Sequence, residues 1–451
     1  MKCFRCLVTS FACLFLGTFY LNGQRLWTLE ECIAYAYQNN LTIKRQMLQT
    51  EIAKNNYQQS YYDLLPDLGA GASHNIGKGR VADYTSFSYS NEVNAGSMGL
   101  RSNVVVSSGF QKINTIRAQK YAFLSAKEQL ERTKNSVALA IASAYLQILF
   151  DREYYEITKS QAEITKQQLD RTRKLYEVGN VARGSLLEME ASYAAELVSV
   201  TNAKNKLDLS YLSLAQMLDL DTVRNFAVAI PEVVVPDTFT ENPDSIFLLA
   251  VETMPEIKSA RYALEKSKSQ LSMARGSRLP QLSLTADYYT QYNLKAERPI
   301  DPQNPLITEK YPIADQLNDK LYKQLSLNLS IPIFMRYQIQ TNISNAKIGQ
   351  LDAEYQLRQT ILDLRKEIEQ AYADALASFE SYRSRQEALK SQEENFKYVQ
   401  QKYEVGLISA IDYNIAKNNY LKAQSDLLQA KYQFVFNMKV LDFYKGKRLS
   451  L

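Results

Sequence analysis

The strongest constraint on the fold is the distribution of proline and glycine. No proline occurs between Pro66 and Pro231 or after Pro332, and no glycine occurs within residues 111–178. Because these two residue types interrupt helices, stretches that lack both can form very long ones. The segment 116–176 is therefore predicted to be one helix of about 60 residues, roughly 90 Å long. That length exceeds the usual helix of a globular domain several times over.

Apolar residues in this segment repeat at every seventh position, which is typical of coiled-coil packing. One series holds Ile141, Ile148, Tyr155, Ala162, Leu169 and Tyr176, and a second holds Ile116, Phe123, Leu130, Val137 and Ala144. Gly179 follows the first series and suits a left-handed helix cap. Leucine and tyrosine residues at helical spacing follow after Ser185. The sequence thus predicts a long helical hairpin with a short tip.

The whole arrangement occurs twice. Leu65-Pro66 recurs as Leu279-Pro280, and the Tyr-Glu-Val-Gly that ends at Gly179 recurs at residues 403–406. Ala144-Tyr145 likewise recurs as Ala371-Tyr372. Chance would not keep three such landmarks in order, so the pattern indicates an internal duplication. The predicted first repeat is 25–219, with a strand pair at 68–107 and a helical hairpin at 112–218. A linker at 220–243 precedes the second repeat, 244–445, with a strand pair at 281–332 and a hairpin at 338–444.

The strand pairs alternate apolar and polar residues. Leu282, Leu284 and Ala286 alternate with Ser283, Thr285 and Asp287, and Leu325 to Ile331 behave in the same way. Two interpretations fit: soluble hairpins that lie on the helices, or membrane β-barrel strands with an apolar outside and a polar inside. The linking segments are expected to be long polar loops, the second of them at 295–320.

Four strands cannot close a barrel, and open strand edges are not tolerated in lipid. A barrel would therefore need several chains. Two copies would give eight strands with a filled interior, and three would give twelve with room for a pore. The predicted fold class is an α+β membrane protein in which a β-barrel continues into a long helical duct.

The first 24 residues are typical of a cleaved secretory signal. Lys2 and Arg5 precede an almost wholly apolar run from Leu7 to Leu21, and Asn22-Gly23 offers a small residue for cleavage. A buried N-terminal helix is the alternative. Cys13 lies within the apolar run, so no lipid anchor is expected.

Composition excludes several classes of function. The 451 residues carry a formal net charge of +5, which is too small and too dispersed for a nucleic-acid binder. Beyond residue 13 the only cysteine and histidine are Cys32 and His74. A Cys/His zinc cluster, an intrachain disulfide and Cys-His or Ser-His catalysis are therefore not expected. No enzyme activity, metal or cofactor is predicted.

The duplicated pattern resembles the TolC-type outer-membrane efflux proteins over essentially the whole mature chain. The resemblance rests on Thr28-Leu29-Glu30-Glu31 with Asn39-Asn40, the two Leu-Pro pairs, Ser330-Ile331-Pro332-Ile333-Phe334 and the two Tyr-Glu-Val-Gly tips. It implies a homotrimer with a twelve-stranded barrel in outer-membrane lipid and a helical tunnel across the periplasm. The implied role is an exit duct for an inner-membrane transporter of RND or ABC type, joined by a periplasmic membrane-fusion adaptor.

The resemblance also implies adaptor contacts at the tips. Val405-Gly406-Leu407-Ile408-Ser409 matches the family pattern fully, whereas the first tip, which begins Val178-Gly179, departs at Asn180 and Ala182. Helix capping alone would explain the glycines. It would not explain Leu407 and Ile408, which we expect to be exposed for a partner.

Two further roles follow from the same resemblance. Asp412 corresponds to an acidic residue of the tunnel-entrance constriction, although the second acid is replaced by Ile415. Tyr403 corresponds to a tyrosine that helps close the entrance, and Arg183 is a candidate partner because Ile408 and Ser185 replace the usual ones. An ordinary helix N-terminal acid is the alternative role for Asp412.

An alternative function is a secreted coiled-coil protein or a periplasmic adaptor without a barrel. Adaptors usually have one helical hairpin between soluble β-domains. The duplication and the alternating strands oppose that interpretation. The transported substrate is not evident from the residues.

Overall fold

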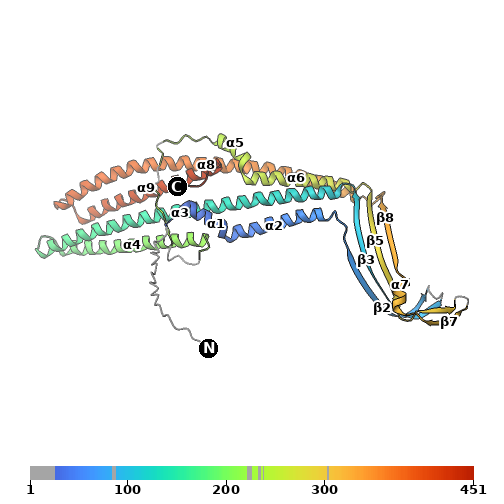
Figure 1. The fold of residues 1–451 in the computed structure, drawn as a ribbon. Helices are drawn as coiled ribbons and strands as arrows, with labels where there is room; N and C mark the ends of the chain where they lie inside the picture. The colour runs from blue at the N-terminus through green and yellow to red at the C-terminus, as the bar shows by residue number, and fades with distance from the viewer. Residues whose placement is uncertain (1–25, 84–87, 221–225, 232–234, 237, 302–303) are drawn as a thin grey trace, which may run out of the picture.

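The computed structural model describes residues 26–83, 88–220, 226–231, 235–236, 238–301 and 304–451. The predicted signal segment, 1–24, lies outside these ranges. The described chain is a long helical bundle that ends in a β-sheet, and the sheet leaves the bundle at an angle (Figure 1). No described helix has an apolar stretch long enough to cross a membrane.

Helix lengths confirm the internal duplication, because each helix of the first half has a partner of equal length in the second. Two helices have 11 residues each, α1 (Leu29–Asn39) and α5 (Pro243–Thr253), and two have 22, α2 (Leu41–Tyr62) and α6 (Pro255–Gly276). The long helices α3 (Gln111–Glu177) and α8 (Gln338–Glu404) have 67 residues each, and α4 (Arg183–Met217) and α9 (Ala410–Tyr444) have 35. The two halves are therefore built to one plan.

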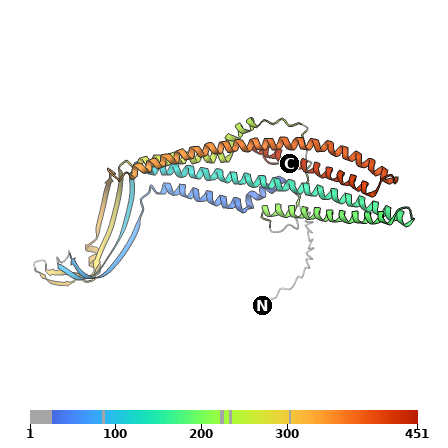
Figure 2. The same ribbon diagram turned by 180° about the vertical axis from the view of Figure 1, so that it is seen from behind.

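In each half the long helix is accompanied by two shorter ones placed one after the other. Helix α3 packs against α2 near the sheet and against α4 toward the tip, and α8 packs in the same way against α6 and α9 (Figure 2). Helix α3 also contacts α6 and α9, which joins the halves. The described chain thus forms a rod of paired helices with two hairpin tips at one end.

The main core lies where these helices meet midway along the rod. Ile141 and Ile148, both from the predicted heptad series, are fully buried there with Tyr145. The Tyr145 hydroxyl donates to the carbonyl oxygens of Trp27 and Ala229, at 3.0 and 2.6 Å. It thereby anchors the two-stranded parallel sheet of β1 (Leu26–Trp27) and β4 (Ala227–Val228) to α3.

The sheet at the end of the rod has four antiparallel strands. They are β2 (Gly69–Asp83), β3 (Ser88–Ser108), β5 (Gln281–Asn293) and β8 (Tyr322–Ser330), in the order β2-β3-β5-β8. Leu284 lies opposite Val104 on one side and Leu327 on the other, so these three side chains share a face. Arg101 and Asp287 pair on the other face at 2.7 Å. The predicted division into an apolar and a polar face is confirmed.

The expectation of two long loops between the strands is wrong in both halves. In the first half β2 and β3 pair as far as Asp83 and Ser88, so only residues 84–87, outside the described ranges, connect them. In the second half the segment 295–320 contains strands β6 (Glu297–Asp301) and β7 (Asn304–Lys310) and helix α7 (Ile313–Asp319). The polar composition of these segments suggested loops. Their backbone groups instead hydrogen-bond between paired strands, β2 with β3 and β6 with β7.

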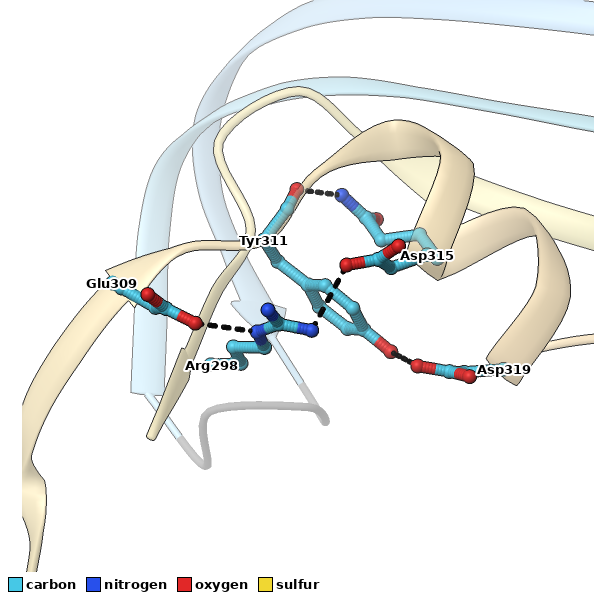
Figure 3. A network of polar contacts seen from close by, with 6 residues as sticks. Arg298, Glu309, Tyr311, Asp315 and Asp319 are labelled. Carbon is cyan, nitrogen blue, oxygen red and sulfur yellow. Dashed lines mark hydrogen bonds and ion pairs between the residues drawn. The ribbon is translucent and has the colours of Figure 1, made fainter. Parts of the chain in front are cut away.

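A polar network orders this outer segment (Figure 3). Arg298 on β6 donates to Glu309 on β7 at 2.8 Å and to Asp315 on α7 at 3.0 Å. The Tyr311 hydroxyl donates to Asp319 at 2.8 Å. The hairpin and α7 are thus tied together by charged and polar contacts.

Candidate functional site at the helical tips

The two hairpin tips turn in the same way. Gly179 and Gly406 have φ values of 79° and 78°, in the left-handed region that glycine adopts without a steric penalty. In the second tip the Leu407 N–H donates to the carbonyl oxygen of Lys402 at 2.9 Å, and in the first the Asn180 N–H makes the equivalent bond at 2.8 Å. Each tip therefore ends its long helix in a Schellman-type cap.

Both tips present apolar side chains to solvent. Val178, Val405 and Leu407 are 69%, 71% and 73% exposed. The expectation that Ile408 would also be exposed is wrong. Ile408 is half-buried against a cluster around Phe396, because the chain turns inward there to start α9.

Ser409 and Asp412 form the N-terminal cap of α9. The Ser409 hydroxyl accepts the Asp412 N–H at 3.2 Å and donates to the Asp412 carboxylate at 2.8 Å. The carboxylate also lies in the first helical turn, where the helix dipole favours a negative charge. Asp412 is exposed, so its charge is available at the tip surface as well.

Tyr403 and Arg183 occupy different environments. Tyr403 is half-buried, stacks on Tyr413 and packs against a cluster of Leu169 and Met189 from the first hairpin with Ala410 from the second. Arg183 is exposed, and within the described ranges no hydrogen bond, ion pair or ring contact joins it to Tyr403. In one chain the two hairpins are thus held near the tip by apolar packing around Tyr403.

Two buried groups in this region were not predicted from the sequence. Tyr413 is 1% exposed, and burial raises the pKa of its hydroxyl to about 12. Lys417 is also 1% exposed and lies 2.8 Å from Glu196 of α4. Alternation of charged and apolar residues along α9 shows that one face is covered, but not which lysine faces another helix.

The described residues show no arrangement suited to metal chemistry. No group of three or more His, Cys, Asp or Glu side chains among them could hold a metal ion. Cys32 is buried and unpaired. What the tips offer is an apolar surface, a capped helix with an exposed carboxylate, and a packed contact between hairpins.

The duplicated helical rod corresponds to a family model of outer-membrane channels that matches the chain twice. The family model described as "Outer membrane efflux protein" matches residues 33–219 and 249–444, so the chain belongs to this family of efflux channels.

Individual relatives agree with this assignment. Outer membrane protein TolC of Escherichia coli strain K12 is 22% identical, over 92% of this chain and 82% of its own length. Outer membrane efflux protein BepC of Brucella suis is 20% identical, over 90% and 83%. The solved CmeC outer membrane channel of Campylobacter jejuni superposes with a TM-score of 0.75 at 20% identity, covering 93% of this chain and 85% of CmeC.

Proposed function

We propose that three copies of this chain close one barrel in the outer membrane and continue it as a helical duct through the periplasm. Three four-stranded sheets would supply twelve strands. The family forms trimers within tripartite efflux systems. The duct would carry substrates from an inner-membrane pump to the outside without chemistry of its own.

The sheet carries this proposal. In the described chain β2 and β8 each pair on one side only, so each sheet offers two free edges. Leu68, Leu325 and Leu327 on its apolar face are 75%, 71% and 66% exposed. Lipid accepts such a face but not free edges, so each β8 must pair with the β2 of a neighbouring copy.

A cysteine scan tests the barrel. Leu327→Cys on β8 is combined with single cysteines along β2, starting at Ala70→Cys, and the protein is oxidised in membranes. Covalent trimers are expected at one or more positions, whereas Leu100→Cys on the inner strand β3 should not crosslink to β8 of a neighbour. Monomers at every β2 position, or release of the protein by carbonate washing, would contradict the proposal.

The tips are proposed as the adaptor-binding surface. Val178, Val405 and Leu407 lie in the two turns with most of their side-chain surface exposed, and exposed apolar residues gathered in this way are typical of a protein contact. Gly179, Gly406 and Ser409 would hold these turns, and half-buried Ile408 would support Leu407 from beneath.

A matched pair of substitutions tests the tip. Leu407→Asp should abolish efflux and crosslinking to the adaptor while membrane insertion stays normal. Leu248→Asp on α5 changes a leucine of similar exposure, 70% against 73%, away from the tips and should leave efflux intact. Equal efflux by both variants would show that Leu407 makes no important contact. Resistance to a panel of amphiphilic compounds is the measurement.

A further inference from the structure

One lysine is buried between the two helical hairpins. Lys417 lies within the first turns of α9 and is 1% exposed. Its Nζ lies 2.8 Å from Glu196 Oε1 on α4 and donates to Thr165 Oγ1 on α3 at 3.1 Å. The Glu196 side chain is itself only 12% exposed. A single ammonium thus joins both helices of the first hairpin to the second.

The helix face around this contact is polar. On α3 the buried residues Thr158, Gln161, Thr165 and Thr172 recur at helical spacing. The three threonine hydroxyls donate to carbonyl oxygens of their own helix, so none of them donates across to α9. Thr165 also accepts the bond from Lys417. Gln161 Nε2 is buried without a partner among the described residues. Among these four described side chains, Thr165 alone bonds to α9.

The charged contact lies between two apolar ones. Toward the tip, Leu169 and Met189 pack with Ala410. Toward the middle of the rod, Leu428 and Tyr432 of α9 join the main core. Between these layers, the Lys417 ammonium is the charged group that contacts both α3 and α4, and the Ser192–Asn414 contact at 3.4 Å joins α4 alone to α9.

The physics of a buried ion pair suits a contact that must form and separate. Loss of hydration offsets much of the attraction between the two charges, so the pair contributes little net stability. When the helices part, water solvates both charges again. A single unpaired charge in the same place is strongly unfavourable. Such a pair therefore defines one docked position without holding the surfaces together as firmly as apolar interdigitation would.

We propose that Lys417, with Glu196 and Thr165, is a releasable cross-link that sets the closed position of the second hairpin at the channel entrance. Lys417 is a positioning residue, since it acts through α9, which carries Asp412 and follows the exposed tip. This inference rests on the proposed channel function.

Single-channel conductance in planar bilayers tests the cross-link. Lys417→Met keeps side-chain length but leaves the Glu196 carboxylate buried and unpaired, so conductance of the resting channel should rise severalfold. Lys422→Met, an exposed lysine on the same helix, should match the parent protein. The charge swap K417E/E196K restores a pair, and K417L/E196L removes both charges. Both double variants should return conductance to the parent value.

A second approach fixes the hairpins covalently. The Ser192 hydroxyl on α4 lies 3.4 Å from Asn414 Oδ1 on α9, about one turn from Lys417. Cysteines at these two positions, oxidised in the Lys417→Met background, should lower conductance to the parent value, and reduction should raise it again. If Lys417→Met does not assemble into trimers, the same measurement is made on Glu196→Gln. This substitution removes the negative charge, but the glutamine amide oxygen still accepts a hydrogen bond, so the variant should assemble.

The outcomes separate the two proposals. The proposed role of Lys417 is overturned if both Lys417→Met and Glu196→Gln conduct like the parent protein. It is also overturned if conductance rises but neither the charge swap nor the disulfide reverses the rise. Neither outcome affects the proposed channel function. A parent protein that forms no pore in the bilayer overturns the channel function and this inference with it.

Discussion

Tyr403 of the second long helix stacks on Tyr413 of the following helix, with ring centroids 4.7 Å apart and ring planes at 25°. Tyr403 also packs against the cluster of Leu169, Met189 and Ala410, which contains residues of both hairpins. One side chain therefore closes the second tip and links it to the first.

Tyr403→Ala should loosen the tip without unfolding the rod. An aromatic pair contributes about 0.5–1.5 kcal/mol beyond burial, so local opening should increase roughly twofold to tenfold. The rate of tryptic cleavage after Lys402 measures this opening. Tyr355→Ala removes a tyrosine that is 60% exposed on the same helix, far from Lys402, and should change the rate little. Equal rates in the two variants would count against a closing role for Tyr403.

Gly406→Val should strain the second tip. No heavy atom lies within 4 Å of a Cβ built at Gly406, so the cost comes from its φ of 78° alone and should be about 1–2 kcal/mol. Gly184→Val is the matched control, because Gly184 has equal space and a φ outside the left-handed region. Thermal unfolding of the purified protein compares the variants, and an equal loss in both would refute the backbone explanation.

Gly276→Ala should disturb the junction of helices and sheet. A Cβ at Gly276 would lie 2.3 Å from the Gly109 carbonyl oxygen, and one at Gly109 would lie 2.4 Å from the Gly276 carbonyl oxygen. The ends of β3 and α6 approach this closely only because both residues lack a side chain. We expect a lower yield of heat-resistant trimers. Gly349→Ala, on α8 with nothing within 4 Å, should be neutral or slightly stabilising, and a normal yield for Gly276→Ala would show that the junction can adjust.

Asp412→Asn tests the proposed charged ring at the tunnel entrance. Three copies of this carboxylate near one axis would attract polyvalent cations. The variant should show weaker block by a trivalent cation added from the periplasmic side. Ser409→Ala removes the helix cap at a cost of about 1 kcal/mol but leaves the charge, so block should persist. Equal block of the parent and the Asn variant would leave Asp412 only its capping role.

Cys32 should make the protein less stable in alkali. Burial, with Glu31 and Glu30 nearby, raises the pKa of its thiol from 9.0 to about 12. Above about pH 9 the thiol of the unfolded chain ionises while the folded one stays neutral, so the free energy of unfolding falls as pH rises. Denaturant titrations measure this dependence, which should shrink in Cys32→Ala. Native Cys32 should also resist thiol reagents near pH 8, where the unfolded chain reacts; rapid reaction of the native protein would contradict burial.

Several features followed from the sequence because they depend on local periodicity. Seventh-position apolar residues such as Ile141 and Ile148 predicted the long helices, and alternation around Leu284 predicted a two-faced sheet. The repeated Tyr-Glu-Val-Gly located both tips and their left-handed glycines. Each of these patterns reports on residues only a few positions apart, whose geometry the backbone of a helix or strand fixes directly.

Other features were decided only by the tertiary structure, because they join residues far apart in the chain. Periodicity did not show that Lys417 is covered by α3 and α4, that Gly109 meets Gly276, or that residues 297–310 pair as a hairpin. Ile408 was expected to be an exposed contact residue, but it is half-buried because it packs against the cluster around Phe396. A helix pattern states which face is apolar, but the helix that covers this face is chosen by packing over the whole molecule, and so the buried charge between the hairpins could not be read from the sequence.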